Sequence, residues 1–155
     1  MTNKDGIEEG QVAPDFSLKD QDGKVVSLKN FKGSDIVLYF YPKDDTPGCT
    51  MEACSFRDNM ASLTKKGAVV LGVSNDDTES HVKFAKKYSL NFKLLSDVDR
   101  TVSKAYGVYQ KRNMYGKDYW GIVRSTFIIG KDGRVRKAWR GVRVDGHTEE
   151  VLKAL

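Results

Sequence analysis

The 155-residue sequence contains 39% hydrophobic and 30% charged residues, which is typical of a soluble globular protein with a single domain, residues 1–155. No apolar run approaches the length of a membrane span, and the first ten residues lack the apolar core of a secretory signal, so we expect a cytoplasmic protein. Two cysteines are too few for a disulfide scaffold or a structural zinc site, and a net charge of +5 raises the question of nucleic acid.

Apolar periodicity and turn residues predict an alternating α/β order. An Asp22-Gly23 turn joins two strands, 16–18 and 25–28, in an amino-terminal hairpin, and residues 36–41 form a β-branched and aromatic run typical of a buried strand. The elements expected after that strand are a helix over 49–65, a strand over 68–73, a helix over 78–88, a helix over 100–106, a polar, aromatic-rich loop of about a dozen residues, strands over 125–129 and 135–140, and a helix from about residue 148. This order predicts a sheet with helices on both faces.

Cys49 opens the predicted helix 49–65, after a loop that contains Pro42, Pro47 and Gly48. At that place a thiol lies among unpaired backbone N–H groups and at the positive end of the helix dipole, which favour a thiolate over a thiol. In open α/β sheets ligands bind beyond the carboxyl ends of the strands, where Cys49 is placed. Cys49 is therefore the candidate nucleophile.

Cys54 is the other cysteine and lies five residues later on the same predicted helix. A second thiol beside a reactive one is typical of a reversible redox centre, but spacing alone equally allows an inert thiol on the apolar helix face. Residues five apart on a regular helix have Cα atoms roughly 8–9 Å apart, whereas a disulfide needs roughly 4.4–6.8 Å. A bond between Cys49 and Cys54 would therefore require the first turns of the helix to unwind.

Several motifs, spread over nearly the whole chain, resemble the peroxiredoxins. Pro42-Lys-Asp-Asp-Thr46-Pro-Gly-Cys49 is similar to the family signature Pro-x-x-x-Thr-x-x-Cys. The wider pattern Thr-Pro-Gly-Cys-Thr-x-Glu-x-Cys resembles the PrxQ branch, also called bacterioferritin comigratory proteins. The opening residues 10–16 and the downstream runs 114–117 and 121–133 resemble the same branch.

The resemblance implies a thioredoxin-like α/β fold with a central mixed β-sheet flanked by helices, and a thiol peroxidase that reduces hydrogen peroxide and organic hydroperoxides. It makes Cys49 the peroxidatic cysteine and Cys54 the resolving cysteine of an intramolecular disulfide. A thioredoxin-like dithiol protein would reduce that disulfide, and no cofactor is implied. The chain lacks the Gly-Gly-Leu-Gly loop and the distal second cysteine of ring-forming peroxiredoxins, so we expect a monomer or a weak dimer.

Carried over by position, Thr46 and Arg124 complete the site and Pro42 shields it. Arg124 can donate to both the thiolate and the peroxide from a rigid guanidinium fork, and the Thr46 hydroxyl can donate to one and accept from the other. The backbone N–H groups of Gly48 and Cys49 can hold the second peroxide oxygen. Simpler interpretations are that Thr46 is a turn residue and that Arg124 is a solvated arginine at a strand end.

Other candidate residues are assigned no role in the site. Glu52 fits the family pattern, but in the first helical turn it could simply complement the helix dipole. His81 and His147 are interpreted as surface residues at helix ends. Packing explains the aromatic residues of the predicted loop at least as well as an entrance to the site does: Tyr115, Tyr119 and Trp120.

Two other functions compete with the peroxidase. A general thiol–disulfide oxidoreductase is disfavoured because the Cys-x-x-Cys spacing is absent. A nucleic-acid-binding or holdase protein would use the basic residues concentrated between residues 131 and 143, which we interpret as a solvated hairpin face. We expect no nucleic acid, membrane or metal among the partners.

Overall fold

The computed structural model describes residues 6–155 of the chain. Its elements, in chain order, are β1 Ser17–Lys19, β2 Val25–Ser27, the 3₁₀ helix η1 Leu28–Phe31, β3 Asp35–Phe40, α1 Pro47–Asp58, α2 Met60–Lys65, β4 Ala68–Ser74, α3 Thr78–Lys87, β5 Lys93–Ser96, α4 Thr101–Ala105, β6 Tyr109–Met114, β7 Lys117–Ile122, β8 Ser125–Ile129, β9 Val135–Arg140 and α5 His147–Ala154. Among residues 6–155, none of the helices combines the length and the apolar character that a membrane crossing requires.

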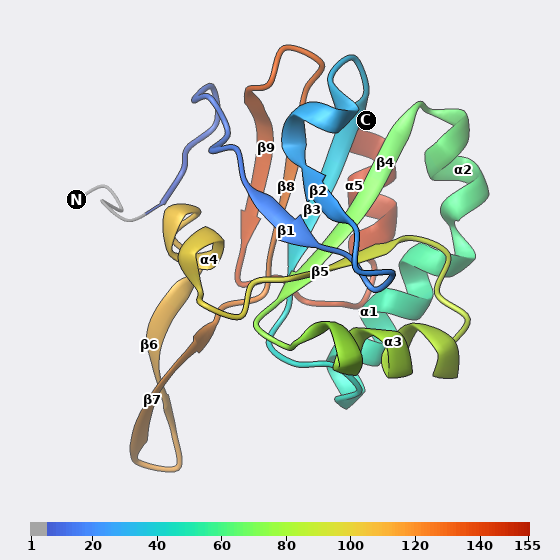
Figure 1. The fold of residues 1–155 in the computed structure, drawn as a ribbon. Coiled ribbons are helices and arrows are strands. Elements are labelled where there is room, and N and C mark those ends of the chain that lie inside the picture. The colour runs from blue at the N-terminus through green and yellow to red at the C-terminus, as the bar shows by residue number, and fades with distance from the viewer. Residues whose placement is uncertain (1–5) are drawn as a thin grey trace.

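Seven strands form one twisted sheet in the order β2-β1-β5-β4-β3-β8-β9 (Figure 1). The central strands β3, β4 and β5 are parallel, whereas β8 and β9 add antiparallel strands at one side and the β1–β2 hairpin closes the other. The predicted mixed sheet, its flanking helices and its amino-terminal hairpin are confirmed.

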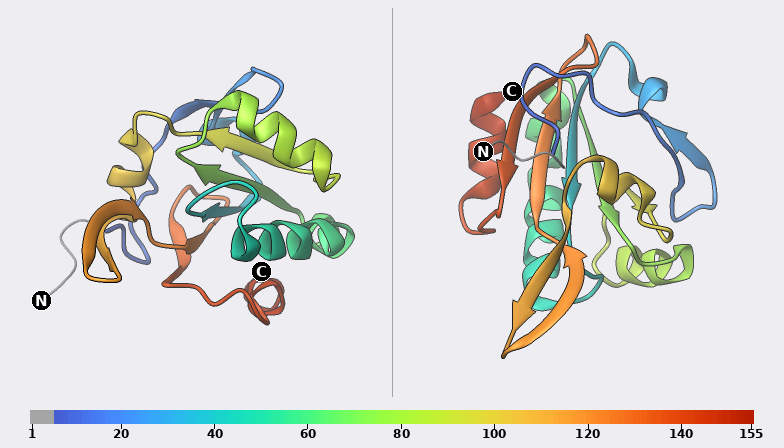
Figure 2. Two further views of the ribbon diagram at one scale, coloured as in Figure 1. Left: turned by 90° about the horizontal axis from the view of Figure 1, so that it is seen from below. Right: turned by 90° about the vertical axis from the view of Figure 1, so that its left-hand side faces the viewer.

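The sheet has a hydrophobic core on each face because its central strand is apolar throughout. Along β3, Tyr39 and its alternate neighbours face one core, to which α1, α2 and α5 contribute Phe56, Leu63 and Val151. Leu38 and Phe40 face the other core, together with α4, η1 and the amino-terminal hairpin. Figure 2 shows α5 on one side of the sheet and α4 and the hairpin on the other.

Two stretches differ from the sequence prediction. The expected loop after residue 106 is wrong, since β6 and β7 form a two-stranded hairpin that projects away from the sheet (Figure 1). Because both strands are largely exposed, their sequences lack the alternation of apolar and polar residues from which a half-buried strand is predicted. The short strand β5 was not predicted, and the expected single helix over 49–65 is interrupted at Asn59.

The basic stretch between residues 131 and 143 lies on and around β9. Two of its arginines hold the amino-terminal segment: Arg134 donates to the Gly10 carbonyl at 3.0 Å, and Arg140 donates to the Ile7 carbonyl at 2.8 Å. These side chains are thus engaged within the molecule, which favours a structural use of the positive charge over a nucleic-acid surface.

Tyr39 and Tyr41 are buried neighbours with different polar environments. The Tyr39 ring stacks on Phe56 with a centroid distance of 4.8 Å and covers Gly72 so closely that a Cβ there would lie 2.9 Å from the ring. Among the described residues, the Tyr39 hydroxyl has no hydrogen-bond partner. The Tyr41 hydroxyl, in contrast, donates to Asp44 at 2.6 Å.

We expect Tyr39→Phe to leave the free energy of unfolding unchanged or to raise it by up to about 1 kcal/mol, because it removes an unpaired buried hydroxyl. Tyr41→Phe should lower it by about 1–3 kcal/mol, because Asp44 loses a donor. Urea unfolding of both variants beside the wild type is the measurement. Equal losses of stability in the two variants would contradict the assignment.

Candidate functional site

Cys49 lies at the start of α1, just beyond the carboxyl end of β3, and its side chain is 1% exposed. Thr46 is the N-cap residue and Pro47 opens the helix, where its missing N–H costs no hydrogen bond. The first intrahelical bond runs from the Thr50 N–H to the Thr46 carbonyl at 2.8 Å. The N–H groups of Gly48 and Cys49 precede that bond and so point out of the helix end, toward the position where a negative charge would be stabilised.

Arg124 reaches this helix end from the link between β7 and β8. Its Nη2 donates to Cys49 Sγ at 3.5 Å, and its Nη1 donates to Glu52 Oε1 at 2.7 Å. A Cβ at Gly48 would lie 3.0 Å from Nη2, so a residue without a side chain permits this close approach. The structure therefore brings together two residues that are 75 positions apart in the chain.

The guanidinium stays charged although it is partly buried. Burial alone would lower the pKa of Arg124, but Glu52 and Cys49 outweigh burial and raise that pKa. One cation is thus shared between the Cys49 sulfur and the Glu52 carboxyl group.

Glu52 contacts the same guanidinium and belongs to the site, although the sequence analysis assigned it no role. It is 1% exposed, and its Oε2 has no hydrogen-bond partner among the described residues. Burial raises the pKa of Glu52 from 4.5 to about 7, and the Arg124 charge opposes this rise.

This raised pKa makes the stability of the protein depend on pH. The folded state binds the proton of the Glu52 carboxyl group more tightly than the unfolded chain does. The stability that the proton contributes is complete below pH 4.5 and is lost as the pH rises through about 7. The sequence signal was a carboxylate one helical turn after Cys49, on the same face.

The other predicted site residues lie around Cys49 without a hydrogen bond to its sulfur. The Thr46 hydroxyl donates to the Lys43 carbonyl at 2.8 Å, while Pro42 is exposed on the loop before the helix. Cys54 is half-buried on α1, and both cysteines are reduced. Since α1 is continuous over both positions, the thiols are held apart in this state.

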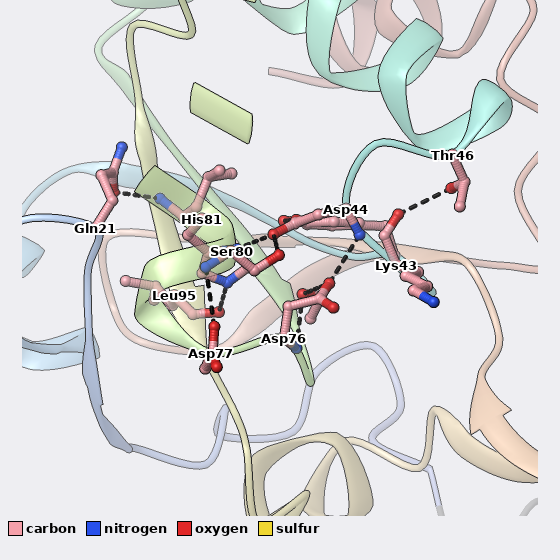
Figure 3. A network of polar contacts seen from close by, with 12 residues as sticks. Gln21, Lys43, Asp44, Thr46, Asp76, Asp77, Ser80, His81 and Leu95 are labelled. Carbon is pink, nitrogen blue, oxygen red and sulfur yellow. Dashed lines mark hydrogen bonds and ion pairs between the residues drawn. The ribbon is translucent and has the colours of Figure 1, made fainter. Parts of the chain in front are cut away.

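The interpretation of the histidines as surface residues is wrong, because His81 is 0% and His147 is 2% exposed. His147 bonds Thr126 Oγ1 at 2.8 Å beneath α1, and burial lowers its pKa, so it is neutral at pH 7. His81 pairs with Asp44 in the loop that leads to Cys49 (Figure 3). Both histidines lie on the buried face of their helices, three or four residues before a buried apolar side chain, Phe84 in α3 and Val151 in α5.

Comparison with known proteins supports a single family. The model of the AhpC/TSA family matches residues 10–138. Peroxiredoxin Bcp of Bacillus subtilis (strain 168) is 50% identical over 149 residues, which are 96% of this chain and 95% of that protein.

Solved structures agree with the sequence relatives and share the thioredoxin-like fold. A bacterioferritin comigratory protein of Xanthomonas campestris superposes with a TM-score of 0.88 at 41% identity, over 96% of this chain and 94% of that one. A PrxQ variant of Xylella fastidiosa superposes with a TM-score of 0.90 at 38% identity, over 95% of this chain and 94% of that one. Similarity of this extent in both sequence and fold shows that the chain belongs to the AhpC/TSA family and is a thiol peroxidase, a peroxiredoxin of the Bcp and PrxQ type.

Proposed function

We propose that Cys49 is the peroxidatic nucleophile of this peroxidase. The observation that carries the proposal is the contact of 3.5 Å between the Arg124 guanidinium and Cys49 Sγ at the amino-terminal end of α1. The thiolate attacks the terminal oxygen of the peroxide, and the O–O bond breaks. The leaving oxygen departs with the electron pair and takes up a proton from the substrate or from solvent. Cys49 is left as a sulfenic acid.

The groups around the sulfur match the charge that develops in this step. The N–H groups of Gly48 and Cys49 lie at the helix end and can donate to the oxygen that becomes negative. Arg124 carries a fixed positive charge there. Thr46 can join them if its hydroxyl turns from the Lys43 carbonyl to the peroxide, and Pro42, which offers no N–H, limits access from the loop side.

Cys54 completes the cycle as the resolving residue. Its thiol attacks the Cys49 sulfenic acid, water leaves, and an intramolecular disulfide forms. The distance that α1 imposes between residues five apart requires the first turns of the helix to open at this step. A thioredoxin-like dithiol protein then reduces the disulfide by thiol exchange and returns both cysteines to the reduced state.

We infer that the substrates include both hydrogen peroxide and organic hydroperoxides. The similar protein of Xanthomonas campestris has been studied for its alkyl peroxide reduction activity. We assign the same classes of substrate to this chain, working as a monomer or weak dimer. A cytoplasmic location suits the cycle, because dithiol reductants keep thiols reduced there.

A pair of cysteine variants tests these roles. Cys49→Ser should abolish peroxide-dependent oxidation of thioredoxin, because an alcohol cannot replace a stabilised thiolate. Cys54→Ser should still react once with peroxide and should accumulate a sulfenic acid on Cys49 that overoxidises readily. The measurements are thioredoxin turnover and mass mapping of each cysteine. Substantial turnover by Cys49→Ser would refute the assignment of the nucleophile, and an oxidised wild type with only intermolecular disulfides would refute that of Cys54.

Arg124→Lys tests the guanidinium geometry. Lysine keeps the charge but offers a single point donor, so it cannot hold both Cys49 and Glu52, and oxidation of Cys49 should slow by about tenfold to a hundredfold. Stopped-flow measurement of the first oxidation step gives the rate. Arg136→Lys is the matched control. Arg136 pairs with Asp35 at the start of β3, away from Cys49, so this variant should keep the wild-type rate. A wild-type rate in Arg124→Lys would remove Arg124 from the site.

A further inference from the structure

The loop between β3 and α1 is held by a buried carboxylate. Asp44 is 8% exposed, and its carboxyl group makes three hydrogen bonds: it accepts from the Tyr41 hydroxyl at 2.6 Å and from the Ser80 hydroxyl at 2.7 Å, and it shares a hydrogen bond with His81 Nδ1 at 2.6 Å. The last two donors come from α3, so this helix fixes the loop (Figure 3). A fully bonded buried network of this kind defines one conformation of the chain.

The contact between Asp44 and His81 is a shared-proton pair. The other ring nitrogen, Nε2, lies 3.0 Å from the Leu95 carbonyl, which can only accept, so Nε2 carries a hydrogen. Nδ1 and the Asp44 oxygen therefore hold one proton between them, either on the ring or on the carboxyl group. Both partners are buried and the contact is short, so the pair holds the loop firmly.

Further contacts hold the same loop from both sides. The backbone N–H of Asp44 donates to Asp76 at 2.7 Å. Asp45 adopts a left-handed conformation with φ 59°, and its carboxylate accepts from Lys87 Nζ and the Tyr88 hydroxyl, each at 2.8 Å. The left-handed backbone costs free energy in a residue other than glycine, and these contacts at the end of α3 offset that cost.

A bound cation would be the alternative use of this cluster. Asp44, Asp76 and His81 each offer a ligand atom, and these atoms lie within 4.8 Å of one another. Both ring nitrogens of His81 are already engaged, as are both oxygens of Asp44. A metal ion would have to displace these bonds, so the cluster fits a hydrogen-bonded anchor better than a metal site.

We propose that Asp44 and His81 are positioning residues for the oxidation of Cys49. We call the hydrogen-bonded pair of Asp44 and His81 the anchor. Thr46, the N-cap of α1, lies two positions after Asp44, so the anchor sets where the helix begins and where the N–H groups at its start point. When the first turns of α1 open for the disulfide, the anchor stays outside the opening segment and returns the helix start to the same place. This inference rests on the proposed role of Cys49.

Asp44→Asn tests the anchor, with Asp20→Asn as a matched control. Asp20 is also buried and also makes three hydrogen bonds, accepting from the Asp22 and Lys24 N–H groups and from Lys93, but it lies in the β1–β2 hairpin. Both variants should lose stability. We expect peroxide oxidation of Cys49 to slow by about tenfold to a hundredfold in Asp44→Asn and to keep its wild-type rate in Asp20→Asn.

Alkylation of Cys49 by iodoacetamide separates positioning from a general loss of thiol reactivity. That reaction needs the thiolate, which Arg124 also contacts, but not the peroxide-binding geometry, so in Asp44→Asn alkylation should slow much less than oxidation. The inference is overturned if Asp44→Asn oxidises Cys49 as fast as the wild type, if Asp20→Asn slows equally, or if alkylation and oxidation slow by the same factor.

Ser80→Ala provides a milder variant should Asp44→Asn not fold. It removes one donor to Asp44 and should slow peroxide oxidation in the same direction, though less, and an unchanged rate would refute the anchor. The wild-type arm tests the proposed function separately. Peroxide that leaves Cys49 unmodified in the wild type would refute the role of Cys49 itself, whereas the variant rates bear only on positioning.

Discussion

The site depends on one guanidinium group that spans two parts of the fold. Arg124 lies in the link between β7 and β8, and its two terminal nitrogens reach Cys49 and Glu52 on consecutive turns of α1. The same contact places a positive charge against the sulfur and fastens the amino-terminal end of the helix to the segment that leads into β8. Because Glu52 is buried with a pKa raised to about 7 by burial, the local charge balance changes near neutral pH, where the carboxyl group loses its proton.

This contact conflicts with the second half of the proposed catalytic cycle. The helix that places Cys49 against Arg124 also keeps Cys54 out of bonding range, so the arrangement suited to peroxide reduction is unsuited to disulfide formation. In that cycle, opening of the first turns of α1 releases Arg124 from both partners. We expect the loop held by Asp44 and the sheet that packs against α1 to stay in place during this step. Reactivity and resolution would thus belong to two conformations of one short segment.

The sequence predicted the parts of the fold whose pattern is local. The strand β8 was predicted from its apolar run, and the turn between β1 and β2 was predicted from its Asp-Gly pair. Cys49 and Arg124 were identified as site residues through the resemblance to the peroxiredoxins. The polar hairpin β6–β7 was missed because exposed strands carry no apolar alternation.

Contacts between distant residues were also missed. Asp44 and His81 are 37 positions apart, and no local spacing indicates that their side chains meet. The contact between Glu52 and Arg124 likewise joins residues 72 positions apart.

Hydrogen exchange across residues 49–57, compared between the reduced protein and the form with a mass-mapped Cys49–Cys54 disulfide, tests most directly whether Arg124 holds a helix that must open. Strong protection when reduced, lost on oxidation, is the predicted result. Unchanged protection in the oxidised form would contradict it.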